Sequence, residues 1–328
     1  MYNHRMSAIP WVTMLVASVA ADYTNPIPQP GEPGYRPTPK HHLRVLFEND
    51  SAFDEDCNYS HGTRIDYAQA ISENRYYGLS IVQNIYTPEY HTNGNVYGQQ
   101  PYAGYLALGA AYLQRGENMG NSVELQLGTI GKPSFAENSQ WFVHEVAGME
   151  QWDGWGDQLA SEMTMQISAR QDWRLAFCEC QTKAGYETDG IIFTRESLGT
   201  VSIAGGVGVG FRWGRNLPDS MQVNGNHAAD YSVGLINKPN YRPEETSWFV
   251  QATAYGSYVA RDMFIDGGAF HHFDRICSRK PWQAEFQLGV GVVRKGISYY
   301  AGGVMHTRRY RTQDKNSMYG TFAISWNW

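Results

Sequence analysis

The sequence has little of what several common protein classes require. Charged residues make up 18% of the 328 residues, and the net charge of −6 leaves no basic stripe to neutralise phosphates. Four cysteines are too few for a disulfide scaffold, and they lack the paired spacing of a zinc site. Beyond the N-terminal segment, no apolar run approaches the ~20 residues that cross a bilayer as a helix. We therefore expect neither a nucleic-acid partner nor a helical membrane protein.

The N-terminal segment has the parts of a secretory signal in the usual order. Arg5 precedes the apolar run 9–17, and small residues follow at Ser18 and Ala20. This order predicts a signal peptide over residues 1–20, which exports the remaining chain. A single membrane-anchoring helix is the alternative, but the run is too short to span a bilayer.

Residues 21–42 are expected to form a proline-rich N-terminal arm. The segment has no periodic apolar pattern, which indicates an extended or disordered linker. It contains six of the chain's 14 prolines: Pro26, Pro28, Pro30, Pro33, Pro37 and Pro39.

From residue 43 to the end, apolar and small or polar residues alternate. One clear segment sets Val207, Val209 and Phe211 against three glycines. Such alternation predicts strands with one apolar face. A soluble sandwich also alternates, but these segments reach roughly ten residues, enough to cross a bilayer when tilted. We expect an all-β fold over residues 43–328, a transmembrane antiparallel β-barrel of about 12 strands.

The end of the chain and the aromatic content support this barrel. The sequence holds 22 Tyr and 10 Trp, which suit the aromatic belts of an outer-membrane protein. The final segment, Phe322 to Trp328, alternates and ends on an aromatic residue, so we expect it to close the barrel. A C-terminal aromatic resembles the signal read by the outer-membrane insertion machinery. That machinery and outer-membrane lipids are the expected partners.

One helical signal stands out among the strands. Ser134 with Glu137 three residues later forms a capping-box pattern, and Gly148 is a natural helix stop. The pattern predicts a short helix over about 134–148 in an extracellular loop. Gln140 and His144, four residues apart, would share one face. Trp141, Trp152 and Trp155 lie in the same region, and we expect them to contact acyl chains.

Strand parity places further polar residues near this helix. If the mature chain starts in the periplasm, Asn49, Asp50 and Ser60 reach the same extracellular rim as His144, and Glu150 follows the helix. Such a set predicts a hydrolytic site with a hard cation, and oxygen ligands suit calcium. A structural interpretation stands beside it: a turn at the Asn-Asp pair, a rim hydroxyl at Ser60 and a surface histidine.

A series of motifs, in order along nearly the whole mature chain, resembles the lipid A 3'-O-deacylase family. These motifs are Glu48-Asn49-Asp50, Tyr59-Ser60-His61-Gly62, Ile85-Tyr86-Thr87-Pro88, Pro101-Tyr102-Ala103-Gly104, Gly128-Thr129-Ile130-Gly131, Gln140-x-x-x-His144, and Gly154-Trp155-x-Asp157-Gln158.

The resemblance implies an outer-membrane enzyme with its active site facing the outer leaflet. Its substrate would be lipid A of lipopolysaccharide, its reaction hydrolysis of the 3'-acyloxyacyl ester, and its cofactor Ca²⁺. By motif, the resemblance assigns catalytic roles to His144, Asn49, Asp50, Ser60 and Gln140, and metal contacts to Asn49, Asp50 and Glu150.

The sequence departs from the family pattern at two places. Ser60 stands where threonine is usual, which keeps the hydroxyl. The loop 89–93 has no lysine to meet a lipid A phosphate. Arg308, Arg309 and Arg311 are an alternative source of positive charge, although an exposed charged loop is the favoured explanation for them.

Two mechanisms and one other function stay open at this point. In the first mechanism His144 activates water and calcium stabilises the oxyanion. In the second, Ser60 is the nucleophile and His144 its base. The other function is a non-enzymatic barrel, a narrow channel or structural protein with a degenerate site.

The cysteines test strand parity. Cys57 and Cys277 are expected at the extracellular rim and Cys178 and Cys180 toward the periplasmic one, whereas disulfide pairing is left open.

Overall fold

A computed structural model of the chain describes residues 39–328, apart from 54, 56, 90–96, 117, 149–150, 220–224, 230, 232–240 and 272–276. The predicted signal peptide (1–20), nearly all of the proline-rich arm and Glu150 lie outside the described residues. The first strand begins at His41, two residues before the expected start of the barrel.

Twelve long strands and one short one account for most of the described chain. The long strands are β1 (His41–Asn49), β2 (Asn58–Ser72), β3 (Arg75–Thr87), β4 (Ala103–Gln114), β5 (Met119–Ile130), β6 (Glu162–Arg174), β8 (Tyr186–Gly199), β9 (Ser202–Arg215), β10 (Ser247–Asp262), β11 (Trp282–Arg294), β12 (Ile297–His306) and β13 (Ser317–Asn327). The short strand is β7 (Cys180–Gln181). The helices are η1 (Asp50–Phe53), η2 (Lys132–Ser134), α2 (Ala136–Ala147), η3 (Gly154–Asp157), η4 (Ala176–Cys178) and α3 (Met263–Asp266).

The long strands form a closed antiparallel barrel. Each pairs with its neighbours in the chain, β1 pairs with the last strand β13, and β6 pairs directly with β8. Strand β7 pairs only with β8 and lies beside the ring as part of a small hairpin. Closure leaves no unpaired edge, which is what a sheet in lipid requires. The predicted antiparallel barrel of about 12 strands is confirmed.

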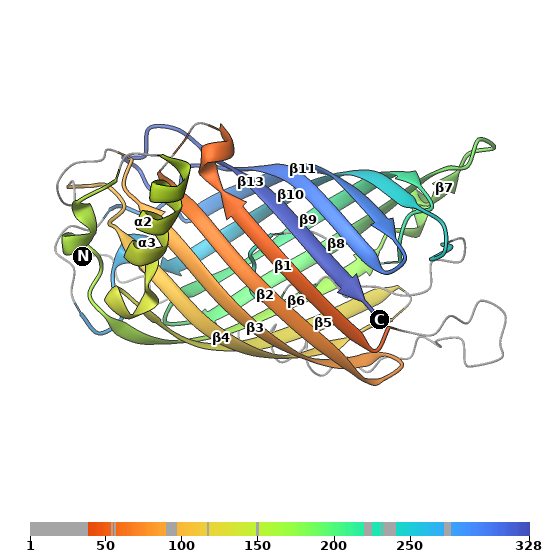
Figure 1. The fold of residues 1–328 in the computed structure, drawn as a ribbon, viewed down its shortest axis with the longest axis horizontal. Helices are drawn as coiled ribbons and strands as arrows, with labels where there is room; N and C mark the ends of the chain where they lie inside the picture. Colours follow the sequence, from red (N-terminus) through yellow and green to blue (C-terminus); the bar gives the residue numbers. More distant parts are fainter. Residues whose placement is uncertain are drawn as a thin grey trace.

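The two ends of the barrel differ. Figure 1 shows α2 and α3 together at one end and β7 at the opposite end. Strand β1 starts at the β7 end, where the chain also finishes after β13. Long connections such as 131–161 and 263–281 lie at the helix end, as extracellular loops of such barrels do. We call the helix end the outer end and the other the periplasmic end.

Side chains alternate between lipid and lumen along each strand. In β11, Phe286, Leu288 and Val290 are exposed on the outside, whereas Glu285 and Gln287 between them are buried. The period of two therefore separates the apolar and polar residues onto the two faces of the wall.

Paired charges fill much of the lumen. Arg44 Nε donates to Asp66 at 2.7 Å, and Arg64 bridges from Asp66 to Glu124 on β5, 3.1 Å away. Each charge has an opposite partner, which offsets the cost of removing it from water. A small barrel filled in this way is a packed structure and not an open pore.

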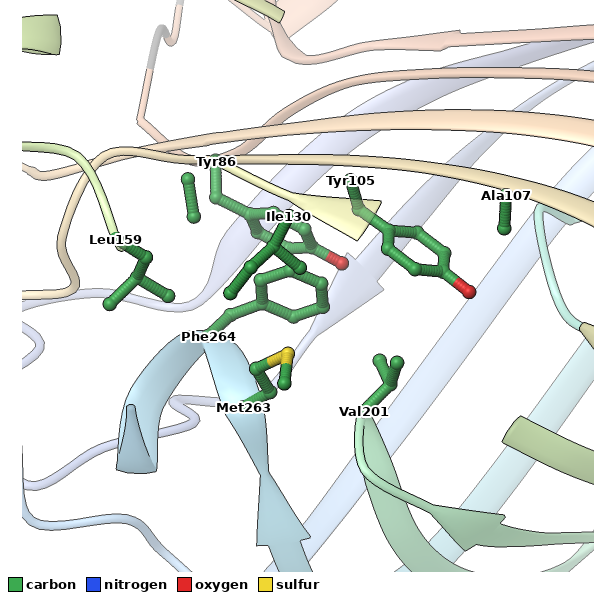
Figure 2. Packing of buried hydrophobic residues seen from close by; sticks show 9 residues of the cluster. Tyr86, Tyr105, Ala107, Ile130, Leu159, Val201, Met263 and Phe264 are labelled. Atoms are coloured by element: carbon green, nitrogen blue, oxygen red, sulfur yellow. The ribbon is translucent and has the colours of Figure 1, made fainter. Parts of the chain in front are cut away.

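An apolar cluster closes the outer end of the lumen. Phe264 of α3 stacks on Tyr86 with ring centroids 4.0 Å apart and packs edge-on against Tyr105. Figure 2 shows Met263 and Val201 beside these rings. The wall residues Ile130 and Ala107 belong to the same cluster.

The loop helix differs in detail from its prediction. It runs over 136–147 and not 134–148, and the capping box is wrong. Ser134 belongs to η2, and its hydroxyl donates to the Gly131 carbonyl at 2.6 Å. Phe135, in the left-handed region at φ 57°, is the residue before the helix. Gly148 ends the helix as predicted, at φ 68°. No helix in the described ranges is long and apolar enough to cross a membrane.

The cysteines lie at the ends that strand parity predicts. Cys57 and Cys277 belong to outer connections, whereas Cys178 and Cys180 belong to the hairpin at the periplasmic end. All four are free thiols. Burial raises the pKa of Cys57 and of Cys277 to about 12, so both are poor nucleophiles.

Candidate functional site

The end of β1 turns a polar residue toward the lipid side of the wall. Glu48 points into the lumen, so the next residue, Asn49, points outward. Helix η1 then folds back over the neighbouring strand β13. A Cβ atom on Gly320 would lie only 2.8 Å from Ala52, which shows how closely η1 packs there. The Asn-Asp pair therefore sits on the outer surface of the barrel.

Helix α2 is seated on the same outer surface, over β3 and β4. A Cβ atom on Gly104 would lie 2.1 Å from the Ser134 hydroxyl and 2.2 Å from the Ala136 Cβ. Gln83, which faces outward from β3, donates to the Ser134 carbonyl at 2.7 Å. The glycine of the Pro-Tyr-Ala-Gly motif thus makes room for the start of α2.

A pocket of about 490 Å³ lies between η1 and α2, against the barrel wall. It is lined by Phe47, Asn49, Asp50, Ser51, Ala52, Val143, His144, Ala301, Gly302, Gly320, Thr321 and Phe322. The structure therefore brings together three of the predicted site residues, Asn49, Asp50 and His144. Its floor is apolar wall, and its polar groups come from the two helical segments.

Local hydrogen bonds orient the acidic side of the pocket. Asn49 Oδ1 accepts from the backbone N–H of Ser51 at 2.8 Å and also from the Ser51 hydroxyl. Asp50 Oδ2 accepts from the backbone N–H of Cys57 at 2.7 Å. These bonds fix the turn around η1 and hold both side chains at the pocket.

The structure places Gln140 and His144 on the buried face of α2, each 5% exposed. Gln140 Oε1 accepts from the indole N–H of Trp155 at 2.7 Å, and Trp155 packs against Tyr102. Trp155 is 1% exposed, so the expectation that it contacts acyl chains is wrong. Gln140 instead connects α2 to the loop that follows it. On the opposite face of α2, Phe142 and Val146 are exposed.

Ser60 is the extra residue of a β-bulge in β2. Tyr59 pairs with Tyr86 and His61 pairs with Ile85, which leaves Ser60 without a partner residue in the register. Its hydroxyl lies 2.6 Å from that of Thr87, which shares the outward side with Ile85. Ser60 is buried near α2 but is not among the residues that line the pocket.

The donors present suit a hard cation in their chemistry. Asn49 and Asp50 contribute an amide and a carboxylate oxygen to one pocket, and calcium prefers such ligands. Glu150, the third expected ligand, lies outside the described residues. Within the described ranges, no three His, Cys, Asp or Glu side chains are grouped to hold a metal ion. The described residues therefore supply two oxygen donors here and no complete metal site.

The three arginines near the outer end are in different settings. Arg308 and Arg311 are exposed, whereas Arg309 forms an ion pair with Asp262 at 2.6 Å and donates to Gln100. Burial lowers the pKa of Arg309, but Asp262, Tyr86 and Tyr310 together raise it by more, and the net pKa lies above its ordinary value. Arg309 is therefore part of the closed outer end.

Sequence reasoning missed the wall residues that form the floor of the pocket. Nothing in the sequence singled out Ala301, and Phe322 was named only as the start of the closing segment. The signal that identifies this floor is Gly320, a glycine at an outward position where the alternation calls for a larger apolar side chain. A missing side chain on the lipid face indicates that another segment packs there.

Fold and location together define an outer-membrane β-barrel that carries a polar pocket on the outside of its wall. The family model of the outer membrane protein LpxR matches residues 9–328, and the chain belongs to this family. No curated protein sequence matches the chain.

One solved structure has the same fold. LpxR from Salmonella typhimurium superimposes with a TM-score of 0.74 at 16% identity, over 88% of this chain and 100% of that one. The β domain of the Bordetella autotransporter BrkA gives a TM-score of 0.42 at 11% identity, over 89% of this chain and 100% of that one. The first likeness supports the same barrel architecture.

Replacement of Gln140 should distinguish a structural role from a catalytic one. Gln140→Leu leaves the buried Trp155 N–H without an acceptor, which should lower the free energy of unfolding by about 1–3 kcal/mol. Gln140→Glu keeps an acceptor and should cost less. Urea unfolding followed by tryptophan fluorescence measures both. Equal stability of Gln140→Leu and the wild type would show that the bond to Trp155 does not hold α2 in place.

Proposed function

We propose that this chain is a lipid A 3'-O-deacylase. The observation that carries the proposal is the position of the pocket, where Asn49, Asp50 and His144 lie together on the lipid-facing side of the wall. A lipid of the outer leaflet reaches that side without leaving the membrane. Membership of the LpxR family supports lipid A as this lipid.

The surroundings of the pocket suit a substrate with acyl chains. Phe47 and Phe322 on the wall and Val143 on α2 are apolar and border the polar groups. Phe142 and Val146, 66% and 74% exposed, extend this apolar surface along the outside of α2. These apolar side chains at the pocket and on the exposed face of α2 suit a substrate with acyl chains.

The mechanism we propose uses His144 as a general base. Its imidazole removes a proton from water, and the oxygen of that water attacks the ester carbonyl. The bond from the carbonyl carbon to the 3' oxygen breaks, and protonated His144 returns the proton to this oxygen. The products are a free acyloxyacyl acid and a 3'-hydroxyl, so no acyl-enzyme forms.

Asn49 and Asp50, together with Glu150, are the residues we propose to hold calcium. When bound, calcium supplies positive charge to stabilise the oxyanion and to orient the ester carbonyl. The turn around η1 supports this role, because its backbone N–H groups hold both side chains at the pocket.

The contacts of Ser60 support a positioning role over a nucleophilic one. Its hydroxyl lies against Thr87 at 2.6 Å and outside the lining that contains His144. A nucleophile must lie within hydrogen-bond reach of its base. Ser60 is better placed to support the wall beneath α2.

The filled lumen argues against the channel alternative. Buried ion pairs cross it, and the cluster around Phe264 closes its outer end. A water-filled passage of useful width needs a larger barrel.

His144→Ala should abolish deacylation while the barrel stays folded, because α2 lies outside the wall. We expect kcat to fall by about 100-fold or more through loss of the general base. Mass spectrometry of lipid A from cells that express each variant measures the loss of the 3' acyloxyacyl chain. His271→Ala, which removes an exposed outer-end histidine bonded to Glu162, is the matched control and should keep activity. Unchanged lipid A in wild-type cells, with the protein folded in the outer membrane, would refute the function.

Chelation tests the metal separately. EDTA should remove activity, and Ca²⁺ should restore it better than Mg²⁺, since flexible oxygen ligands favour the larger ion. The measurement is hydrolysis of purified lipid A in detergent by the folded protein. Full activity in excess chelator would show that no metal is required.

Substitution of Ser60 separates the two mechanisms. Ser60→Thr keeps the hydroxyl and should retain most activity, and Ser60→Ala should retain measurable turnover. If Ser60→Ala is as inactive as His144→Ala and an acyl group is trapped on Ser60 of the wild type, the water mechanism is wrong.

A further inference from the structure

A segment of the long connection between β9 and β10 lies inside the barrel. The connection leaves β9 at Arg215 and joins β10 at Ser247, both at the periplasmic end. Its residues 225–229 and Tyr231 nevertheless contact inward side chains of β1, β3, β5 and β11. We call residues 225–229 together with Tyr231 the lumen segment.

One residue of the lumen segment contacts the inner side of the candidate site. The backbone N–H of Asn226 donates to Glu48 Oε1 at 3.1 Å, and its side-chain amide donates to the Tyr59 hydroxyl at 3.2 Å. The Tyr59 hydroxyl donates in turn to Glu48 Oε2 at 2.6 Å. The same Asn226 amide also donates to Asn84 on β3. Glu48 is 1% exposed, so these bonds are shielded from water.

Two of the three partners of Asn226, Glu48 and Tyr59, are direct chain neighbours of predicted site residues. Glu48 precedes Asn49, and Tyr59 precedes Ser60 at the bulge. Consecutive strand residues point to opposite faces, so a side chain held firmly inside the lumen fixes the direction of the next one outside. The hydrogen bonds to Glu48 and Tyr59 therefore act on the outward residues through the backbone.

The lumen segment is itself held at other points. Glu124 on β5 accepts from the backbone N–H of Ala229 and from the Tyr231 hydroxyl, the latter at 3.0 Å. His227 lies 3.2 Å from Glu285 on β11. Tyr231 also packs against Tyr76 and Leu113 on the wall. Because the segment has several such anchors on β5 and β11, loss of any one of them should leave Asn226 in place against Glu48.

We propose that Asn226 is a positioning residue, which acts through Glu48 and Tyr59 to set the geometry of Asn49 and Asp50. This inference rests on the proposed function for its activity test. Asn226 contacts Glu48 and Tyr59 from the lumen, whereas the proposed substrate approaches from the lipid side of the wall. Asn226 therefore acts on the site through hydrogen bonds in the lumen, and it is separate from the residues proposed to touch the ester.

Two matched pairs of variants test the proposal. Asn226→Ala removes the side-chain bond from Asn226 to the Tyr59 hydroxyl, and Tyr59→Phe removes that bond together with the bond from Tyr59 to Glu48. His227→Ala and Tyr231→Phe each remove one bond of the same lumen segment, to Glu285 and to Glu124, and neither of these acceptors is a chain neighbour of a site residue. We expect the first pair to lower kcat at least about tenfold with KM unchanged, since small misplacements of reacting groups are costly. The second pair should keep kcat.

Hydrogen–deuterium exchange gives a measurement that does not need activity. The amides of Ser51 and Cys57 donate to Asn49 and Asp50, and they should exchange faster in Asn226→Ala and Tyr59→Phe than in the two controls. Equal exchange and equal kcat in all four variants would overturn the proposal, as would equal losses in both pairs. If Asn226→Ala fails to fold, Tyr59→Phe decides. A wild type inactive on lipid A refutes the proposed function, while the exchange result still decides the positioning role.

Discussion

Closure of the sheet is the constraint on which the rest of this structure depends. Once β6 pairs with β8 and β1 with β13, every strand residue must face either lipid or lumen. The backbone then has no edge at which a polar group can be left over. Polar side chains such as Arg64 and Glu124 can be buried only inside, where they pair. The outside of the wall stays apolar, and polar chemistry there has to be brought by segments that fold back from the outer end.

The candidate site uses this arrangement. Helices η1 and α2 each place polar groups over an apolar wall, and each needs a glycine beneath it, Gly320 and Gly104. The lipid-facing side of the wall forms the floor of the pocket. The proposed hydrolase needs water for the reaction, whereas the acyl chains of its substrate lie in the membrane. A pocket at the rim of the barrel borders both water and lipid.

Much of the fold followed from the sequence because alternation with period two is a local signal. The strand β11, with Phe286 and Leu288 against Glu285 and Gln287, was readable without any tertiary information. The polar residues of the site were found through ordered motifs, since none of them is distinctive alone. The start of α2 was misread, because Ser134 belongs to η2, where its hydroxyl donates to the Gly131 carbonyl, and Phe135 is the residue before the helix. Trp155 was misplaced because an indole that bonds to Gln140 looks the same in the sequence as one that meets lipid. Such choices are made by packing between distant segments.

The bulge at Ser60 changes the phase of strand β2. Before it, Tyr59 points inward; after it, the even-numbered residues from Gly62 through Asp66 do. The extra residue shifts the alternation of inward and outward side chains by one position. Tyr59, before it, pairs with β3, and the residues from His61 on pair with both β1 and β3. The number of residues in β2 at the bulge therefore affects the direction of its side chains more than the identity of residue 60 does. Loss of one residue here would force either the rim or the body of the strand to turn inside out, exposing Arg64 to lipid or moving Tyr59 away from Glu48. The rim and the membrane-spanning wall can each keep their own pattern because a single unpaired residue separates them.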